Sequence, residues 1–395
     1  MNTFGPLPLT LYVHLPWCER KCPYCDFNSH PLKTDLPASD YIDGLIADLE
    51  AVEKTYPKRR LQAVFFGGGT PSLFEGNQIA RLLERLDQRG WLDSQTEITL
   101  EANPGSAEAD RFRRYRDCGV NRLSLGVQSF NNKSLSVLGR IHNGEEAKKA
   151  CGAIREAGFD NFNIDLMHGL PGQATADALA DLRAALDFSP THLSLYQLTI
   201  EPNTAFAANP PVLPDEEVLW EIRCAVQDLA CEAGFEHYEV SAFARPGYRC
   251  RHNLNYWEFG DYIGIGAGAH SKLSVENAVY RWSRPRHPRE YLKTVTAGTV
   301  PDTGPPLTAA ALRFEFLLNA LRLEAGFEKD LFAQRTGLDW KKEEPLFKDA
   351  ANAGLLHLDE NRVQTTPLGW RFLDDLLERF LDQPKRADVH NMMLQ

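Results

Sequence analysis

The sequence predicts an α/β protein: an open, partial barrel of six βα units, with added strands and a small C-terminal α+β domain. Apolar runs rich in β-branched and aromatic residues alternate with segments of helical period, and this alternation repeats six times. Polar residues stand where these runs end, as expected at the active face of a βα barrel. Six units rather than eight leave the barrel open.

Length and charge narrow the class of protein. A chain of 395 residues can form a barrel-type domain and a smaller one. A formal net charge of −11 argues against a nucleic-acid partner. We see no apolar run long enough to span a membrane and no signal peptide, so we expect a cytoplasmic protein.

The first unit carries the strongest motif. A strand at 9–15 leads into Cys18, Cys22 and Cys25, which have CxxxCxxC spacing. Thiolates on one tight loop suit a soft metal centre. A zinc knuckle would need a second Cys or His pair nearby, and a disulfide framework does not suit three clustered cysteines. We therefore predict a [4Fe-4S] cluster with three cysteine ligands, which leaves one iron open to a small molecule.

The second and third units add candidate ligand-binding groups. After a helix at 39–54, a strand at 62–66 runs into Gly67-Gly-Gly-Thr-Pro71. Glycines at the end of a strand let a ligand approach the backbone, although a plain turn would also explain them. A helix at 77–88 precedes a strand at 97–104. Near its end, Glu101 could bind an ammonium group or a ribose hydroxyl, or be a solvated edge charge.

The later units follow the same pattern. We predict strands at 122–128, 161–165 and 191–199 and helices at 144–157 and 215–233. Gln128 and Asp165 stand at strand ends, and Arg140 precedes the first of these helices.

These residues carry a resemblance to a known family. The cysteine motif after a first strand resembles the radical S-adenosylmethionine (SAM) superfamily. The longer string Tyr12-Val-His-Leu-Pro-Trp-Cys18, with Cys25-Asp-Phe-Asn, is similar to the oxygen-independent coproporphyrinogen III dehydrogenase family, and within it to the haem-chaperone branch. The resemblance implies a radical SAM barrel with SAM as cofactor. It assigns SAM contacts to Tyr12, Tyr24, Gly68, Gly69, Thr70, Glu101, Gln128, Arg140 and Asp165, with Thr199 a weaker match.

A second motif, His252-Asn-Leu-Asn-Tyr256-Trp257, resembles the HNxxYW pattern associated with haem binding in the chaperone branch. His252 could ligate haem iron, and Tyr256 and Trp257 could cover a porphyrin face. The alternative is core packing with a hydrogen-bonded histidine. His14 and His270 are lower-ranked ligands.

Two departures distinguish the branches. Phe27 stands where the dehydrogenases have a fourth cysteine, and only eleven residues precede Tyr12, where they have a longer segment. Both favour a haem chaperone that passes haem to apo-haem proteins such as respiratory-chain enzymes. The alternative is an oxygen-independent dehydrogenase that converts coproporphyrinogen III to protoporphyrinogen IX by SAM-derived radical decarboxylation. Homodimer formation and peripheral membrane contact stay open.

The rest of the chain divides into further parts. We place a SAM core domain at 1–240, the HNxxYW segment with extra strands and a linker at 241–305, a winged-helix-like domain at 306–383, and a flexible tail at 384–395. The last domain is predicted from helices at 308–323, 330–336 and 344–353, a hairpin at 354–365 and a helix at 367–381. Acidic residues outnumber basic ones there, so we expect packing or docking rather than nucleic-acid binding.

Overall fold

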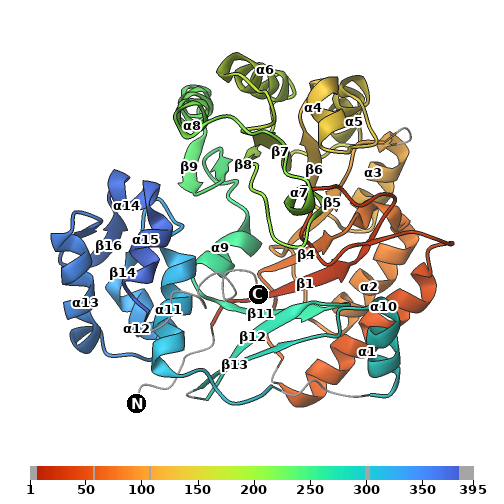
Figure 1. Cartoon of the computed structure of the whole chain (residues 1–395). Helices are drawn as coiled ribbons and strands as arrows, with labels where there is room; N and C mark the ends of the chain where they lie inside the picture. Colours follow the sequence, from red (N-terminus) through yellow and green to blue (C-terminus); the bar gives the residue numbers. More distant parts are fainter. Residues whose placement is uncertain (1–6, 57, 106–107, 277, 299–302, 382–395) are drawn as a thin grey trace.

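A computed structural model describes residues 7–56, 58–105, 108–276, 278–298 and 303–381. Within them, eleven strands form one sheet in the order β13-β12-β11-β1-β4-β5-β6-β7-β8-β10-β9 (Figure 1). Its central strands pair in parallel and in chain order. They are β1 (Leu9–Leu15), β4 (Ala63–Gly68), β5 (Glu97–Ala102), β6 (Arg122–Gln128), β7 (Phe162–His168) and β8 (His192–Gln197). These strands are the predicted six units, and the fold class is confirmed.

Helices pack on the outer face of this sheet. Leu45 of α1 and Leu82 of α2 share one buried core with Leu11 and Val13 of β1. Burying such side chains contributes about 1.5–3 kcal/mol each. The helices of this part of the chain are α1 (Ala38–Thr55), α2 (Gly76–Gln88), α3 (Glu108–Asp117), α4 (Asn132–Val137), α5 (Gly144–Glu156), α6 (Thr175–Leu186), α7 (Ala205–Ala208) and α8 (Glu216–Glu232). Of these, α7 lies instead against the cysteine loop, where the Phe206 N–H donates to Pro23 O over 2.9 Å.

Added strands extend both edges of the sheet. β11 (Asp261–Ile265) pairs in parallel with β1, and the antiparallel β12 (His270–Val275) and β13 (Ala278–Ser283) follow it. At the other edge, β10 (Ala242–Ala244) and β9 (Glu236–Glu239) are antiparallel. Helix α10 (Pro288–Thr296) packs against α1.

Helix α9 (Arg251–Trp257) lies at the end of the barrel where the strands begin. Its Asn255 Nδ2 donates to Thr10 Oγ1, 3.2 Å away, near the start of β1. The backbone N–H of Arg251 donates to Glu97 Oε1 at the start of β5, over 2.9 Å. The HNxxYW segment is therefore a helix at the opposite end of the barrel from the cysteine loop.

The C-terminal part has its own core and a small sheet in the order β14-β16-β15. Figure 1 shows it beside α9 and β11. The predicted hairpin is present, but the single last helix is wrong, because the backbone breaks at Phe372 (φ −114°, ψ 48°). The elements are α11 (Ala309–Ala320), β14 (Phe327–Glu328), α12 (Lys329–Thr336), α13 (Trp340–Asn352), β15 (Leu356–Leu358), β16 (Arg362–Thr365), α14 (Pro367–Arg371) and α15 (Leu373–Glu378). The predicted domain limits stay a prediction, and the tail at 384–395 lies outside the described residues.

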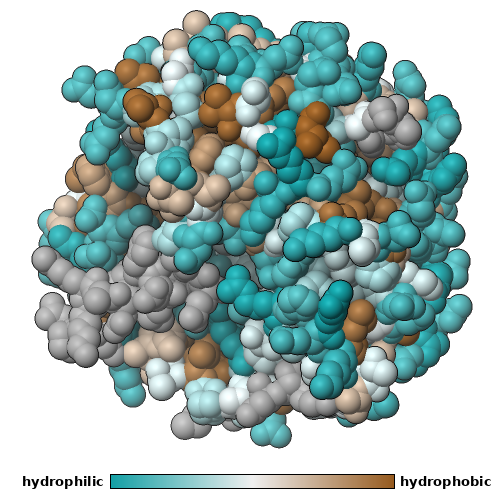
Figure 2. Space-filling model, turned by 45° about the vertical axis from the view of Figure 1, so that its right-hand side comes forward, coloured by the Kyte–Doolittle hydropathy of each residue, from teal (hydrophilic) through white to brown (hydrophobic). Residues whose placement is uncertain are grey.

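The surface in Figure 2 is mostly hydrophilic, and its apolar residues occur in small separate groups. Among the described helices, none is long and apolar enough to cross a membrane.

A buried ion network fixes β11 to its neighbours. Asp261 Oδ2 lies 2.7 Å from Arg59 Nη2, and Asp261 Oδ1 lies 3.2 Å from the Lys272 ammonium. Lys272 and Asp261 are 1% and 0% exposed, so neither has solvent as an alternative partner.

We predict that Asp261→Ala lowers the free energy of unfolding by about 3–5 kcal/mol, because it leaves the Lys272 charge buried and uncompensated. Chemical denaturation measures this. Asp110→Ala, which breaks an exposed pair with Arg113, is the matched control and should change little. Equal stability of the two variants would contradict the prediction.

Candidate functional site

The three cysteines lie on a loop that follows β1 and is closed by a short pairing of β2 (Trp17–Cys18) with β3 (His30–Pro31). Asn28 anchors this loop by donating hydrogen bonds to Ala267 O and Arg286 O, each over 2.9 Å. The Nε2 of His14 in β1 donates to Asn28 O over 2.9 Å. The loop is thereby held on the ends of β1 and β11.

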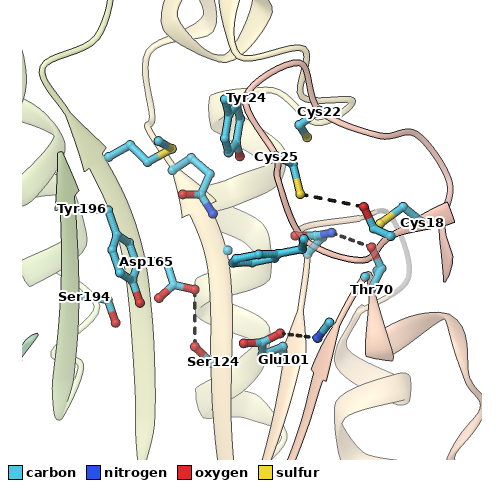
Figure 3. Close-up of a pocket in the computed structure, with 18 of the residues that line it drawn as sticks. Cys18, Cys22, Tyr24, Cys25, Thr70, Glu101, Ser124, Asp165, Ser194 and Tyr196 are labelled. Carbon is cyan, nitrogen blue, oxygen red and sulfur yellow. Dashed lines mark hydrogen bonds between the residues drawn. The ribbon is translucent and has the colours of Figure 1, made fainter. Parts of the chain in front are cut away.

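All three cysteine side chains are half-buried, free of disulfides and line one cavity (Figure 3). Burial raises the pKa of the Cys18 and Cys25 thiols, and a bound metal would replace their protons. Within the described part of the chain, no three His, Cys, Asp or Glu side chains converge closely enough to hold a single metal ion. Three cysteine thiols at one cavity are the type of ligand that an iron–sulfur cluster takes, and in this respect the residues fit the predicted cluster.

The cavity, of about 350 Å³, extends from the cysteine loop into the barrel. Of the predicted SAM residues, Tyr24, Gly68, Gly69, Thr70, Glu101, Gln128, Arg140 and Asp165 line it, together with Thr199 and Phe27. Figure 3 shows Tyr196 of β8 across the cavity from the cysteine loop. Tyr12 lies behind this lining, with its hydroxyl 3.0 Å from His14 Nδ1. The structure thus brings together residues from all six units.

The glycines at the end of β4 are required because a side chain at either position would clash with a neighbour. Gly68 has a φ of 115°, and a Cβ there would lie 2.5 Å from the His14 ring. A Cβ on Gly69 would lie 2.5 Å from the backbone oxygen of Trp17. Only glycine lets this turn pass so close to the cysteine loop.

Arg140 connects the cysteine loop to the barrel. Its Nη2 donates to Asn103 Oδ1 and to Gly126 O, each over 2.6 Å, and its Nη1 lies 3.7 Å from Cys22 Sγ. Asn103 in turn donates to Thr70 Oγ1 over 3.0 Å. A positive charge is therefore fixed beside the cysteines.

Two half-buried carboxyl groups lie deeper in the cavity. Glu101 Oε2 accepts from the Gly68 N–H over 3.3 Å, and burial, reinforced by Asp165, raises the pKa of Glu101 to about 8. Asp165 accepts from Asn163 over 2.7 Å and from Ser124 over 3.4 Å, and burial raises its pKa. With Arg140 at one end and carboxyl groups at the other, the cavity suits a ligand that carries both charges.

Of the HNxxYW residues, Asn253 lines this cavity, whereas His252, Tyr256 and Trp257 do not. His252 is 5% exposed, and its ring stacks on Phe65 at 5.0 Å and on Tyr12 at 6.1 Å between centroids. Tyr256 stacks on Tyr262, and Trp257 lies under the Arg322 guanidinium. His14 is buried and bonded at both nitrogens, whereas His270 is exposed.

Sequence reasoning missed several lining residues, including Arg122, Ser124, Asn163 and Ser194. The alternation of side chains along a strand could have identified residues of this kind. Arg122, Ser124 and Gly126 share the inward face of β6 with Gln128.

We predict that Arg140→Ala weakens SAM binding by about tenfold or more, because a charge-assisted interaction is lost, while the iron content stays unchanged. Equilibrium dialysis and iron analysis after reconstitution measure the two quantities. Arg183→Ala, on the exposed face of α6, is the control. Unchanged SAM affinity, or loss of iron, would contradict the assignment.

Comparisons with known proteins agree with this geometry. Residues 12–185 match the radical SAM superfamily, and residues 307–372 match the HemN C-terminal domain. The proteins named heme chaperone HemW from Escherichia coli and Haemophilus influenzae are 47% and 45% identical, over 95% of this chain and 98% of each relative. A mitochondrial radical SAM domain-containing protein 1 from Bos taurus is 34% identical over 97% of this chain and 89% of its own.

Among solved structures, coproporphyrinogen III oxidase (HemN) from Escherichia coli, described as a radical SAM enzyme, aligns with a TM-score of 0.79 at 25% identity. The alignment covers 95% of this chain and 90% of that one. Near-full-length identity of this size establishes the family: the chain belongs to the HemW family of radical SAM proteins.

Proposed function

We propose that the protein is a haem chaperone, which binds haem and transfers it to apo-haem proteins. The observation that carries this proposal is the 47% identity to a protein named heme chaperone HemW, over 95% of the chain. Phe27 supports it. This residue is 61% exposed on the cysteine loop and cannot replace the fourth cysteine of the dehydrogenases as a thiolate.

The cysteine loop and the cavity fit the cofactors of the family. Cys18, Cys22 and Cys25 would hold a [4Fe-4S] cluster, and SAM would occupy the cavity against Tyr24, Gly68, Gly69, Thr70, Glu101, Gln128, Arg140 and Asp165. When bound, the cluster supplies an electron to SAM. The chain's own residues orient the ligand, with Arg140 beside the cysteines and the carboxyl groups deeper in the cavity. Tyr12 supports this lining from behind.

Haem binding by the HNxxYW helix has a specific feature in its favour. Burial lowers the pKa of His252 to about 3, so its imidazole is neutral, and its Nδ1 has no hydrogen-bond partner among the described residues. A neutral, unpartnered ring nitrogen is the form that ligates iron. Because the ring is buried against Phe65, α9 must move before His252 meets haem. Tyr256 and Trp257 on the same helix would then offer aromatic faces to the porphyrin.

A second candidate is an oxygen-independent coproporphyrinogen III dehydrogenase. The TM-score of 0.79 with HemN and the retained cavity residues favour it. It would convert coproporphyrinogen III to protoporphyrinogen IX by SAM-dependent radical decarboxylation.

We also propose a cellular compartment for the protein and the class of proteins that receive its haem. Its eight cysteines are free thiols in the described structure, which fits a reducing compartment such as the cytoplasm. The haem recipients would be respiratory-chain enzymes and similar apo-proteins. Homodimer formation and peripheral membrane contact remain proposals to test by sedimentation and by vesicle co-flotation.

Anaerobic haem titration of the reconstituted protein tests the proposed function. We expect tight binding of one haem per chain, weakened by His252→Ala, because the iron loses its ligand. His357→Ala, on an exposed strand of the C-terminal part, is the control.

Three other outcomes would change the assignment. Tight binding unaffected by His252→Ala would keep the chaperone but remove His252 as the ligand. Absence of haem binding would overturn the chaperone. Formation of protoporphyrinogen from coproporphyrinogen would establish the second candidate.

The raised pKa of Glu101 predicts a pH dependence of SAM binding. Below pH 8 this carboxyl is mostly protonated, and a cationic ligand prefers the ionised form. SAM affinity should therefore rise by up to about tenfold per pH unit from pH 6.5 to 8. Glu101→Gln should lack this rise, and the comparison removes any titration of SAM itself. Parallel pH profiles of the two proteins would rule out Glu101 as the cation-binding group.

A further inference from the structure

The deep end of the cavity contains one buried cation without a bonded partner. Arg122, the first residue of β6, lines the cavity and is 2% exposed. No hydrogen bond or ion pair reaches its guanidinium from the described residues, and its Nε is buried without a partner. Burying an unpaired charge costs several kcal/mol, so a guanidinium in this position needs an anionic or strongly polar partner.

The polar groups around Arg122 are already bonded to one another. His192 Nδ1 donates to Asn163 Oδ1 over 2.7 Å, and its Nε2 accepts from the Tyr238 hydroxyl over 2.8 Å. Ser194 donates to the same Asn163 oxygen over 3.1 Å. Ser124 and Asp165 are joined to Asn163 as well. Arg122 stands outside this network, as does the hydroxyl of Thr99, its register partner on β5, which has no hydrogen-bond partner among the described residues.

The nearest acidic groups do not complete the pairing. Burial opposes the charge, but the fields of Cys250, Glu97, Tyr238 and Asp165 outweigh it and raise the pKa of Arg122, so the side chain stays a cation. Glu97 Oε1 already accepts a hydrogen bond from the Arg251 N–H. Neither Glu97 nor Asp165 forms an ion pair with the guanidinium in the described structure. Arg122 therefore keeps its donors for a ligand.

SAM does not supply this anion. The proposed SAM site lies at the carboxyl ends of the strands, beside the cysteines, whereas Arg122 begins its strand. Arg122 lies close enough to Glu101 and Asp165 to oppose the rise that burial causes in the pKa of both, but SAM carries a single carboxylate, which we expect beside Arg140 and the cysteines. Asn253 of α9 lines the same cavity as Arg122, and Arg122 lies close enough to His252 to contribute to its lowered pKa.

We propose that Arg122 is a carboxylate-binding residue at the deep end of the barrel, and that its ligand is a propionate group of haem. This inference rests on the proposed haem-binding function. A guanidinium presents paired N–H donors that match a carboxylate, and haem is an apolar plane that carries two such groups. With His252 adjacent, the iron ligand and the propionate contact would lie at the same end of the barrel.

The test compares haem with haem dimethyl ester, whose propionates carry no charge, in anaerobic titrations of the reconstituted full-length protein. We expect the wild-type protein to bind haem about ten- to a hundredfold more tightly than the diester. Arg122→Met should lose most of this preference while its affinity for the diester stays unchanged. Arg183→Met, on the surface of α6, is the matched control and should keep the preference.

Thermal unfolding separates this role from a structural one. Removal of an unpaired buried charge should leave the Tm of Arg122→Met unchanged or raised. A large fall would mean that Arg122 is a counter-ion of the neighbouring carboxylates, and would overturn the inference. Should that variant not fold, Arg122→Lys, which keeps the charge but loses the paired donors, should still reduce the preference for haem.

The two proposals fail in different ways. Wild-type protein that binds haem and the diester equally, or an Arg122→Met variant that keeps the preference, would overturn the carboxylate site and leave haem binding intact. Wild-type protein that binds neither compound would overturn the proposed function and this inference with it.

Discussion

The position of β1 between β4 and β11 is the constraint on which the site depends. Parallel pairing on both sides sets Tyr12 beside Phe65 and Gly264, and brings His14 beside Gly67. The cysteine loop leaves the end of this strand, so its place follows from the same register. A shift of one residue would turn both Tyr12 and His14 to the other face of the sheet. The buried Asp261 pairs with Lys272 and Arg59 hold β11 in place, and thereby support β1 as well.

The cavity combines charges that are costly to bury. Glu101, Asp165 and Arg122 are enclosed within one barrel, and burial opposes the charge on each of them. A protein interior keeps such groups only where partners compensate them. Asp165 has neighbours that do so. Among the described residues, Glu101 has one long bond from a backbone N–H, and the guanidinium of Arg122 has no bonded partner. The incomplete pairing of these groups, rather than the volume of the cavity, marks where ligands are expected.

Much of this site could be predicted from the sequence, because parallel strands bring their carboxyl ends to one edge. That geometry alone gathers the cysteines, Gly68, Glu101 and Asp165. The location of α9 could not be predicted in the same way. Its seven residues have no side-chain cap, and its place depends on bonds to Thr10 and Glu97, residues distant in the chain.

The isolation of Arg122 could not be read from the sequence either. An arginine at the start of a strand is ordinary, and it becomes informative only when His192, Asn163 and Ser194 beside it are found to be bonded to one another. The alternation of side chains along the strand could have predicted that Arg122 lies inside the barrel, but it could not have predicted that the guanidinium lacks a partner among the described residues.

The two sites proposed at opposite ends of the barrel are connected by packed aromatic rings. The cysteine loop and the proposed SAM site occupy the end where the strands finish, and α9 closes the end where they begin. Between them lie stacked rings, in which His252 contacts Phe65 and Tyr12. The Tyr12 ring lies 3.0 Å from the position that a Cβ on Gly67 would take, at the end of β4 where the glycine motif begins. If α9 moves to expose His252 to haem, Phe65 and Tyr12 lose the ring that packs against them. Haem binding at one end would then alter the support of the cofactor site at the other, which gives a physical reason for a chaperone to keep the residues of a radical SAM barrel.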